Sequence, residues 1–408
     1  MALRATDSHR LQMENDRSML TRAEHAFEFA QQQVRLLSER EPGLYPLYTQ
    51  GGKWRHPGTL WTAWGDGFLP GMMWIFFEET GAPEWRRLAE LYSKGLEHRK
   101  DDRDVHDLGF LFFHGTYRRW YEVTVRGGAP DQALLEAVIH AGRTLAMRFN
   151  ERAGCLRSFH GEDSNFIDVM MNVGLIFYAG ISAGDRSLVE LAHRHCRTTM
   201  RTLVREDGST AHEGIFDVKT GEFLRQSTQQ GYNALSCWSR GLAWSLYGFG
   251  TCYRLTGEQE YLSAAESNAG YWMSHIPTDG SHYGLAPWDF DAPDEGPLSR
   301  MISDTSASAI AASGLMSLSR LTEDTGRSQR YLECGLRTID ALASHYLGDT
   351  GREAKAAGEA AEWEGILRNG VYHIHKGLGV GESVMWGEYF FVEAVQKVLH
   401  LLRKGAVD

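Results

Sequence analysis

The sequence has few cysteines and no recognisable secretory signal. Five cysteines are scattered along the 408 residues, and no two of them form a CxxC pair. Because their number is odd and they are dispersed, these cysteines suggest neither a disulfide framework nor a thiolate zinc site. The N-terminal segment MALRATDSHRLQMENDR is polar and charged and lacks the apolar run of a signal peptide. We therefore expect a protein of the reducing cytoplasm.

Positive charge and long apolar runs are also scarce. The chain has 42 Lys and Arg against 53 Asp and Glu, a formal net charge of -11, so a general basic surface for nucleic acid or anionic lipid is not expected. The longest stretch without a charged residue runs from Val169 to Gly184 and contains Asn172. A membrane-spanning helix needs about 20 apolar residues. We expect no nucleic-acid partner and no membrane span.

Aromatic residues are abundant. The chain has 12 Trp, 16 Tyr and 18 Phe, many of them beside glycine or charged residues. Aromatic rings beside a few polar groups are typical of a carbohydrate-binding pocket.

The helical segments come in pairs that are separated by glycine. An apolar segment ends in a small residue or Thr followed by Gly, and an amphipathic segment begins at once, as at Thr80-Gly81-Ala82-Pro83. Similar junctions contain Gly128, Gly184, Gly257 and Gly326. The apolar segments predicted to be helical are Phe68–Glu78, Leu108–Val123, Ile167–Ile181, Trp238–Tyr253 and Thr305–Leu321. Their amphipathic partners are Glu84–Arg99, Asp131–Phe149, Arg186–Val204, Glu258–His275 and Ser328–Tyr346.

Two further helices, Arg22–Leu37 and Met385–Arg403, bring the total to about twelve. A helix that is apolar on most sides is buried, whereas one with a polar stripe faces solvent. The alternation of apolar and amphipathic helices predicts two concentric rings, that is, an all-α (α/α)6 barrel. We expect a single domain that spans 1–408, with 1–20 as a flexible N-terminal extension. An α-solenoid is the alternative, but the junctions are unevenly spaced.

Three long segments that are not predicted to be helical connect the helices. Ser209–Gly231 is predicted to form a small β-hairpin at the mouth of the barrel, because β-like runs flank a Thr-Gly turn. Pro277–Arg300 and Gly351–Gly381 are predicted to be long loops, and long loops inside a compact domain are usually functional.

Two aspartates, Asp107 and Asp168, stand at the start of apolar helices. Each could simply be a helix N-cap, a position that Asp favours. In a ring of inner helices, however, such helix starts converge on one mouth, and two carboxylates facing each other repel. One is then pushed to a higher pKa and becomes a proton donor at neutral pH.

A second cluster is QQGYNALSCWSRGLAW, which contains Gln230, Trp238, Arg240 and Trp244. Tryptophan stacks on a sugar ring, and arginine binds a carboxylate through two parallel hydrogen bonds. Core packing explains Trp244 equally well. Arg240 lies among apolar residues and needs an anion, for which Asp304 is the alternative to a ligand.

Three further residues are candidates for substrate binding. Trp64 precedes the first apolar helix, His212 lies in the STAHEGIF segment, and His373 lies in VYHIHK. His373 and His375 have strand-like spacing but no third ligand pattern, so we expect no metal and no other cofactor. GxSxG and HExxH are absent, so serine-hydrolase and zincin chemistry have no support.

Together, the motifs WGDGFLPG, HDLGF, IDVMMN, CWSRGLAW, DTSASAIAASGL and ESVMWGEYFFVEA resemble, in this order, those of the unsaturated glucuronyl hydrolases of glycoside hydrolase family 88. The resemblance extends from about Tyr45 to Val398. It implies an (α/α)6 barrel and a metal-free exo-hydrolase. The implied substrates are oligosaccharides with a 4,5-unsaturated uronic acid at the non-reducing end, most simply disaccharides.

The resemblance also implies a role for each candidate residue. Asp168 is similar to the general acid and base, and Asp107 to the second essential carboxylate. His212 and Gln230 are similar to the polar residues around the reacting sugar, and Arg240 to the contact for its carboxylate. Trp64, Trp238 and Trp244 are similar to the stacking aromatics.

The chain departs from the family pattern at Gly65, Leu69, Phe159 and Glu388. In the family the loop Arg368–Lys376 meets the neighbouring sugar. It has Gly370, His373 and His375 where sulfate-accepting relatives have Ser and Lys, which favours unsulfated substrates.

The alternatives to an unsaturated glucuronyl hydrolase are an unsaturated rhamnogalacturonyl hydrolase, a sugar epimerase and a non-catalytic carbohydrate-binding toroid.

Overall fold

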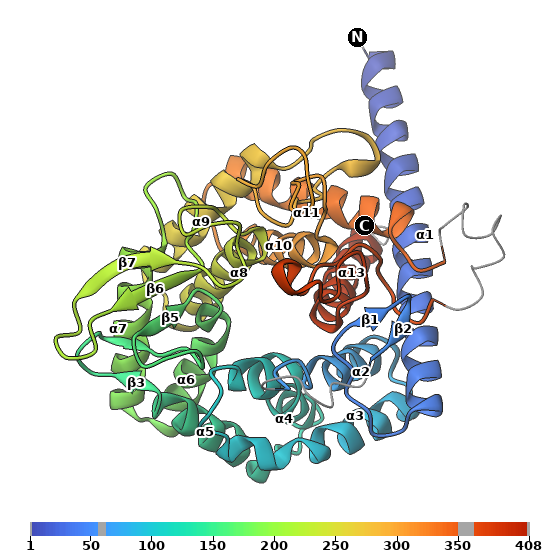
Figure 1. Ribbon diagram of the computed structural model, residues 1–408. Helices are drawn as coiled ribbons and strands as arrows, with labels where there is room; N and C mark the ends of the chain where they lie inside the picture. The colour runs from blue at the N-terminus through green and yellow to red at the C-terminus, as the bar shows by residue number, and fades with distance from the viewer. Residues whose placement is uncertain (1, 56–62, 350–362, 406–408) are drawn as a thin grey trace.

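Two concentric rings of helices form the protein, as a computed structural model shows for residues 2–55, 63–349 and 363–405 (Figure 1). The inner ring consists of α2 (Phe68–Thr80), the π-helix η2 (Gly109–Gly115) with α4 (Tyr117–Arg126), α6 (Val169–Ala183), α8 (Ser239–Thr256), α10 (Thr305–Leu318) and α13 (Met385–Gly405). The outer ring consists of α1 (Ala2–Arg40), α3 (Pro83–Gly95), α5 (Gln132–Ala146), α7 (Arg186–Leu203), α9 (Gln259–His275) and α11 (Thr325–His345). This arrangement is the predicted (α/α)6 barrel.

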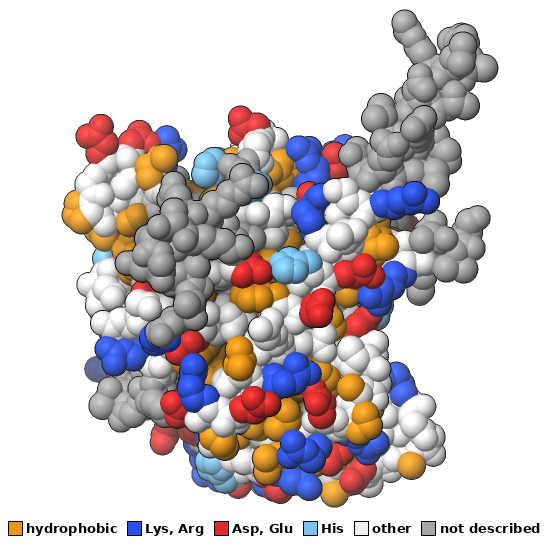
Figure 2. Space-filling model, turned by 90° about the vertical axis from the view of Figure 1, so that its right-hand side faces the viewer, with side chains coloured by type: hydrophobic (Ala, Val, Ile, Leu, Met, Phe, Trp, Pro, Cys, Tyr) orange, Lys and Arg blue, Asp and Glu red, His pale blue; other side chains and the backbone are white. Residues whose placement is uncertain are grey.

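Inner and outer helices differ in sequence as their positions require. In α6 every residue from Val169 to Phe177 is buried, whereas α7 buries one stripe and exposes charged residues. On the face shown in Figure 2, acidic and basic side chains are intermixed. Ion pairs such as that of Arg35 in α1 with Glu84 in α3 link two outer helices. Apolar helices such as α6 therefore lie in the inner ring, and helices with a charged stripe such as α7 lie in the outer ring.

The first and last helices close the ring. Helix α1 packs against α13 and α11, so segments from the two ends of the sequence lie side by side. Helix α1 begins at Ala2, earlier than the predicted Arg22, and its N-terminal part projects beyond the ring (Figure 1). The expected flexibility of 1–20 stays a prediction.

The junction glycines confirm most of the predicted helix ends. Gly81, Gly184 and Gly257 follow α2, α6 and α8 in the left-handed conformation, with φ of 67°, 65° and 76°. The prediction for Gly326 is wrong. Helix α10 already ends at Leu318, and Gly326 lies in the first turn of α11, where the Asp324 side chain accepts from the backbone N–H of Arg327 and starts the helix.

A small sheet at one end of the barrel contains the predicted hairpin. Strands β6 (Glu213–Phe216) and β7 (Phe223–Ser227) pair antiparallel, with Glu213 opposite Ser227, and β5 (Ser164–Phe166) pairs with the other edge of β6. The remaining strand pairs are short: β1 (Thr49–Gln50) with β2 (Lys53–Trp54), and β3 (Phe149–Asn150) with β4 (Cys155–Leu156).

The predicted loops connect the helices at their ends. Pro277–Arg300 contains one short helical turn, η3 (Gly280–His282). The second loop, 351–381, is described from 363 onward and includes the turn η4 (Ile374–Lys376); its residues 351–362 lie outside the described part of the chain.

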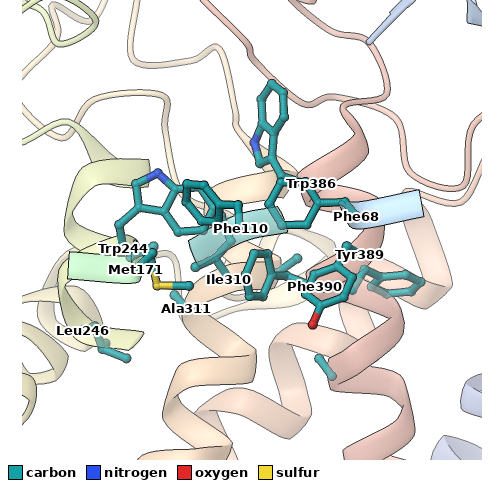
Figure 3. Packing of buried hydrophobic residues seen from close by; sticks show 14 of the residues in the cluster. Phe68, Phe110, Met171, Trp244, Leu246, Ile310, Ala311, Trp386, Tyr389 and Phe390 are labelled. Atoms are coloured by element: carbon teal, nitrogen blue, oxygen red, sulfur yellow. The ribbon is translucent and has the colours of Figure 1, made fainter. Parts of the chain in front are cut away.

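The barrel is filled by aromatic side chains rather than open along its axis. Side chains from the four inner helices α2, η2, α8 and α13 converge at the centre, namely Phe68, Phe110, Trp244, Tyr389 and Phe390 (Figure 3). Phe110 packs on Trp244 with ring centroids 5.1 Å apart, and Trp244 packs on Phe390 at 5.4 Å. This packed layer forms the floor on which the site rests.

Candidate active site

The starts of the inner helices surround a cavity of about 590 Å³. Trp64 precedes α2, Asp107 precedes η2, Asp168 precedes α6, and Arg240 lies in the first turn of α8. The predicted convergence of these helix starts on one mouth is therefore confirmed. The other residues that line the cavity are His106, Phe159, His160, Phe166, Gln229, Gln230, Tyr372, His373, His375 and Lys376.

Asp107 and Asp168 are not helix caps, although capping aspartates are common elsewhere in this chain. Asp168 occupies the N-cap position of α6, but its side chain makes no capping hydrogen bond, and Leu108 rather than Asp107 occupies the N-cap position of η2. By contrast, Asp185 and Asp304 cap α7 and α10 through their side chains. The carboxyl groups of Asp107 and Asp168 are thus directed to the cavity instead of the helix backbone.

Burial makes both of these carboxyl groups weak acids. Their side chains are only 7% and 14% exposed. Burial raises the pKa of Asp168 to about 6, partly offset by the charge of Arg240. Burial, together with the negative charge of Asp168, raises the pKa of Asp107 to about 8. Near neutral pH the pair therefore carries about one proton.

Gly109 and Asn172 hold the two aspartate-bearing helix starts close together. The Asn172 side chain accepts from the backbone N–H of Phe110 at 2.9 Å and donates to the Asp168 carbonyl at 3.2 Å. A Cβ atom on Gly109 would lie 2.4 Å from the Cα of Asn172. The glycine of HDLGF and the asparagine of IDVMMN are therefore required by the close approach of these two helices.

His212 lies behind Asp168, buried at 2% exposure. Its Nδ1 accepts from the backbone N–H groups of Gln229 and Gln230 at 3.0 and 3.2 Å. The ring proton therefore resides on Nε2, which lies 3.6 Å from Oδ2 of Asp168. Neither of these two atoms has a hydrogen-bond partner within the described residues.

Arg240 is buried and already has protein partners. Its Nη1 donates to the Val371 carbonyl and lies 3.4 Å from Oδ2 of Asp304, so the alternative partner considered from the sequence is present. Its Nη2 donates to Oε1 of Gln230 at 2.7 Å and to the Tyr372 carbonyl at 2.8 Å. The four N–H groups of Nη1 and Nη2 thus already have acceptors, so a ligand carboxylate that binds the guanidinium through two parallel hydrogen bonds must replace at least one of them.

The structure separates the predicted aromatic residues by depth. Trp64 lines the cavity and rests on Trp386 with ring centroids 4.7 Å apart. Trp238 is 3% exposed and lies under the Arg240 guanidinium, whose Cζ is 4.5 Å from the centroid of the indole ring. Trp244 is 1% exposed and belongs to the aromatic core (Figure 3). Gln230, Arg240 and His373 lie at the cavity with Trp64, whereas His212, Trp238 and Trp244 are one layer behind it.

Sequence reasoning missed Phe166, Gln229, His160 and Tyr372, which also line the cavity. Phe166 stands two residues before Asp168, and Gln229 is adjacent to Gln230, so proximity to predicted residues could have indicated both. Tyr372 and His160 come from irregular loops, where no local pattern predicts which side chains face inward. Phe159, a departure from the family pattern, also lines the cavity, whereas Glu388 is buried and accepts from the backbone N–H groups of Ile366 and Leu367.

No group of three or more His, Cys, Asp or Glu residues is arranged to hold a metal ion within 2–55, 63–349 and 363–405. In the same ranges, every helix is too short or too polar to cross a bilayer.

Comparison with known proteins supports one assignment, although no protein-family model matches the chain. The chain is 31% identical to the unsaturated glucuronyl hydrolase of Bacillus sp. (strain GL1) over 347 residues, which cover 83% of this chain and 86% of the relative. It is 29% identical to the unsaturated chondroitin disaccharide hydrolase of Streptococcus pneumoniae, with 82% and 81% covered.

The solved structures agree with the relatives found by sequence. The unsaturated glucuronyl hydrolase from Bacillus sp. GL1 matches with a TM-score of 0.81 and 28% identity over 92% of this chain and 96% of that one. A glucuronyl hydrolase specific for heparin matches with a TM-score of 0.81 and 26% identity over 94% and 98%. Sequence identity, coverage and fold all lead to the same conclusion: the chain belongs to the unsaturated glucuronyl hydrolases, which are glycoside hydrolases.

Proposed function

We propose that this enzyme removes a 4,5-unsaturated uronic acid from the non-reducing end of oligosaccharides released by polysaccharide lyases. The observation that supports this proposal is that Asp107 and Asp168 line one cavity and that both carboxyl groups have a raised pKa. A carboxyl pair that keeps one proton at neutral pH is what the addition of a proton to a C4=C5 double bond requires.

The substrate is a vinyl ether, because its double bond is joined to the ring oxygen and conjugated to the carboxylate. In the reactive form of the pair the one shared proton lies on Asp168 and Asp107 is ionised. Asp168 delivers this proton to C4, and positive charge develops at C5 and the ring oxygen. The ionised Asp168 then takes a proton from water as the water oxygen bonds to C5. The resulting hemiketal opens, and the C1 hemiacetal releases the leaving sugar with its hydroxyl group. One water molecule is consumed, and the double bond is lost.

The two carboxyl groups differ in exposure, and this difference supports their division of roles. The Asp168 side chain is 14% exposed and that of Asp107 is 7% exposed, so Asp168 is more open to the cavity. When the proton of the pair lies on Asp168, Asp107 is ionised; it then orients the acid and stabilises the developing cation. Because chemistry occurs at the double bond and not by displacement at C1, the carboxylate spacing of retaining and inverting glycosidases does not apply.

Arg240 and Gln230 are the proposed contacts for the carboxylate of the reacting sugar. Of the four acceptors around the Arg240 guanidinium, Gln230 Oε1 is the only neutral side-chain group, the others being the Asp304 carboxylate and two backbone carbonyls. An anionic ligand exchanges most readily with this neutral amide. Trp64 provides the apolar wall on which the sugar ring stacks.

The loop that contains His373 supports a preference for unsulfated substrates. Relatives differ in substrate: one solved structure is of an enzyme specific for heparin, and another holds dGlcA-GalNAc6S. In this chain burial lowers the pKa of His373 to about 4, so the imidazole is neutral at pH 7 and offers a sulfate no counter-charge. Lys376 lines the same cavity but is exposed, and an exposed cation is well screened. Unsulfated unsaturated disaccharides are the proposed substrates.

The proposed compartment is the cytoplasm. All five cysteines are free and buried, and the Sγ atoms of Cys196 and Cys252 lie 3.8 Å apart as thiols and not as a disulfide. Free thiols are typical of proteins that work in a reducing environment.

A panel of lyase-generated disaccharides, sulfated and unsulfated, tests the proposed activity through the loss of ultraviolet absorbance of the conjugated acid. The wild-type protein should consume unsulfated glucuronyl disaccharides, and Asp168→Asn should reduce the rate by at least about 1,000-fold while retaining binding. Asp185→Ala, which removes a helix cap instead, serves as the control and should lower stability but keep the activity.

Other outcomes would reject the proposal in favour of a specific alternative. Consumption of unsaturated rhamnogalacturonan disaccharides alone would indicate a rhamnogalacturonyl hydrolase. A retained double bond with altered sugar configuration would indicate an epimerase. Binding without any change in absorbance would indicate a non-catalytic binding protein, and wild-type turnover by Asp168→Asn would remove Asp168 from the acid role.

A further inference from the structure

His106, the residue that precedes Asp107, is buried at 2% exposure and lines the cavity. The backbone N–H of Phe159 donates to its Nδ1 at 3.0 Å. Because a nitrogen that accepts a hydrogen bond carries no proton, the proton of the neutral ring resides on Nε2. This Nε2 lies 3.3 Å from Oδ1 of Asp107. The loop that contains Phe159 therefore fixes which nitrogen of His106 faces the carboxyl group.

The same arrangement occurs on the other side of the cavity. The Nδ1 of His212 accepts backbone N–H groups, and its Nε2 faces Asp168 at 3.6 Å. Burial lowers the pKa of His106 to about 3 and lowers that of His212 well below its usual value, so both rings are neutral at working pH. Each carboxyl group of the pair thus faces one neutral imidazole N–H whose tautomer is set by the backbone.

We propose that His106 is a positioning residue for the reaction: its Nε2–H holds Oδ1 of Asp107 and stabilises the ionised form of that carboxylate while the sugar carries positive charge. This inference rests on the proposed hydration reaction. A neutral donor suits the role because a cationic histidine would repel the developing positive charge, whereas an N–H dipole stabilises the carboxylate without adding net charge.

The other charged groups near Asp107 have different primary partners. Arg148 donates to the carbonyls of Arg103, Arg157 and Ser158, and Arg99 donates to the carbonyl of Ala63 and pairs with Asp66 and Asp102. The titratable and charged groups that act on Asp107 are Asp168, Arg148, Arg99, Asp102, Tyr372 and the adjacent His106. Both arginines favour the ionised carboxylate from a distance, whereas Nε2 of His106 lies 3.3 Å from Oδ1 of Asp107.

Two substitutions of His106 distinguish the roles of its two ring nitrogens. His106→Asn keeps an acceptor near the Nδ1 position for the Phe159 N–H but has no atom at the Nε2 position. His106→Gln places an amide N–H near the Nε2 position and gives up the acceptor. If His106 acts through Nε2, the asparagine variant loses the interaction with Asp107 and the glutamine variant recovers part of it.

The measurement is the pH dependence of kcat/KM on the unsaturated disaccharide that the wild-type protein consumes. We expect His106→Asn to lower kcat about 10- to 100-fold and to move the alkaline limb upward by about one pH unit, because loss of a donor disfavours the ionised carboxylate. His106→Gln should recover about 10-fold in kcat and return the limb toward the wild-type position. An unmoved alkaline limb in His106→Asn, or a glutamine variant as impaired as the asparagine variant, would overturn the inference.

A readout that does not depend on turnover distinguishes failure of this inference from failure of the proposed function. The ¹⁵N NMR resonances of His106 in wild-type protein, assigned by their loss in His106→Asn, should show a neutral Nε2–H tautomer between pH 5 and 8. An Nδ1–H tautomer or a protonated ring would overturn the role of His106. If the wild-type protein consumes no disaccharide but the tautomer is as expected, the reaction is wrong and the geometry at His106 stands.

Discussion

Replacement of Asp107 by asparagine should change the pH dependence of folding stability as well as abolish catalysis. In the folded protein burial raises the pKa of Asp107 from 3.8 to about 8. The folded state therefore holds this proton more tightly than the unfolded state does. The associated stabilisation is fully present below about pH 4 and is lost as the pH rises to about 8. Asparagine has no proton to lose, so the variant should not show this decline.

The size of the effect follows from the shift in pKa. A rise from 3.8 to about 8 corresponds, at about 1.4 kcal/mol per unit, to roughly 5–6 kcal/mol across the whole titration. Most proteins do not tolerate the acid end of that range, so the useful interval is pH 5.5 to 8, which contains about 3 kcal/mol. The stability of Asp107→Asn minus that of wild type should therefore rise by about 3 kcal/mol over this interval and level off above pH 9.

Urea denaturation at pH 5.5, 7, 8 and 9.5 measures this difference directly. Asp104→Asn is the matched control, because Asp104 lies in the same loop but is exposed, and its difference from wild type should stay within about 0.5 kcal/mol at every pH. A difference for Asp107→Asn that is constant with pH would refute the conclusion that burial holds Asp107 protonated, and with it the conclusion that the aspartate pair carries one proton at neutral pH.

Three further predictions concern activity and packing. The kcat/KM of the wild-type enzyme should be bell-shaped and highest between about pH 6 and 8, where the aspartate pair carries one proton; a flat profile from pH 5 to 9 would contradict this. Arg240→Lys should raise KM at least about 10-fold, because lysine lacks the planar fork that meets a carboxylate and holds Gln230, and an unchanged KM would exclude the proposed carboxylate contact. Gly109→Ala should destabilise the protein by about 2–3 kcal/mol or more, because its Cβ would lie 2.4 Å from the Asn172 backbone, while the control Gly250→Ala, with open space around it, should be neutral or stabilising by up to about 1 kcal/mol in thermal or urea denaturation. Equal effects of the two glycine substitutions would show that the helix starts are not closely packed there.

The layered fold was predictable because its signals are local. Apolar segments such as 167–181 must be buried, and amphipathic segments such as 186–204 must cover them, whichever neighbours they meet. Left-handed glycines such as Gly184 mark where one helix ends before the next begins. The convergence of Asp107 and Asp168 follows in turn, since helix starts in such a ring lie at one end.

The exact chemistry of the site was less predictable because it depends on contacts between distant segments. Arg240 lies 64 residues before Asp304 and more than 130 before the carbonyls of Val371 and Tyr372, so no local pattern could show how its donors are used. Gly326 was misplaced for a different, local reason. The side chain of Asp324 starts α11 early, and this hydrogen bond outweighs the junction pattern.

The amino-acid sequence by itself determined the class of fold, the order of the helices and the two carboxyl groups at the mouth of the barrel. These depend on periodicity and on residue types at helix ends, which are properties of short segments. Only the tertiary structure decided that these aspartates do not cap their helices, that Trp64 reaches the cavity while Trp244 stays in the core, and that His106 and His212 each present Nε2–H. Burial and directed hydrogen bonds set those outcomes, and both arise when remote parts of the chain pack together.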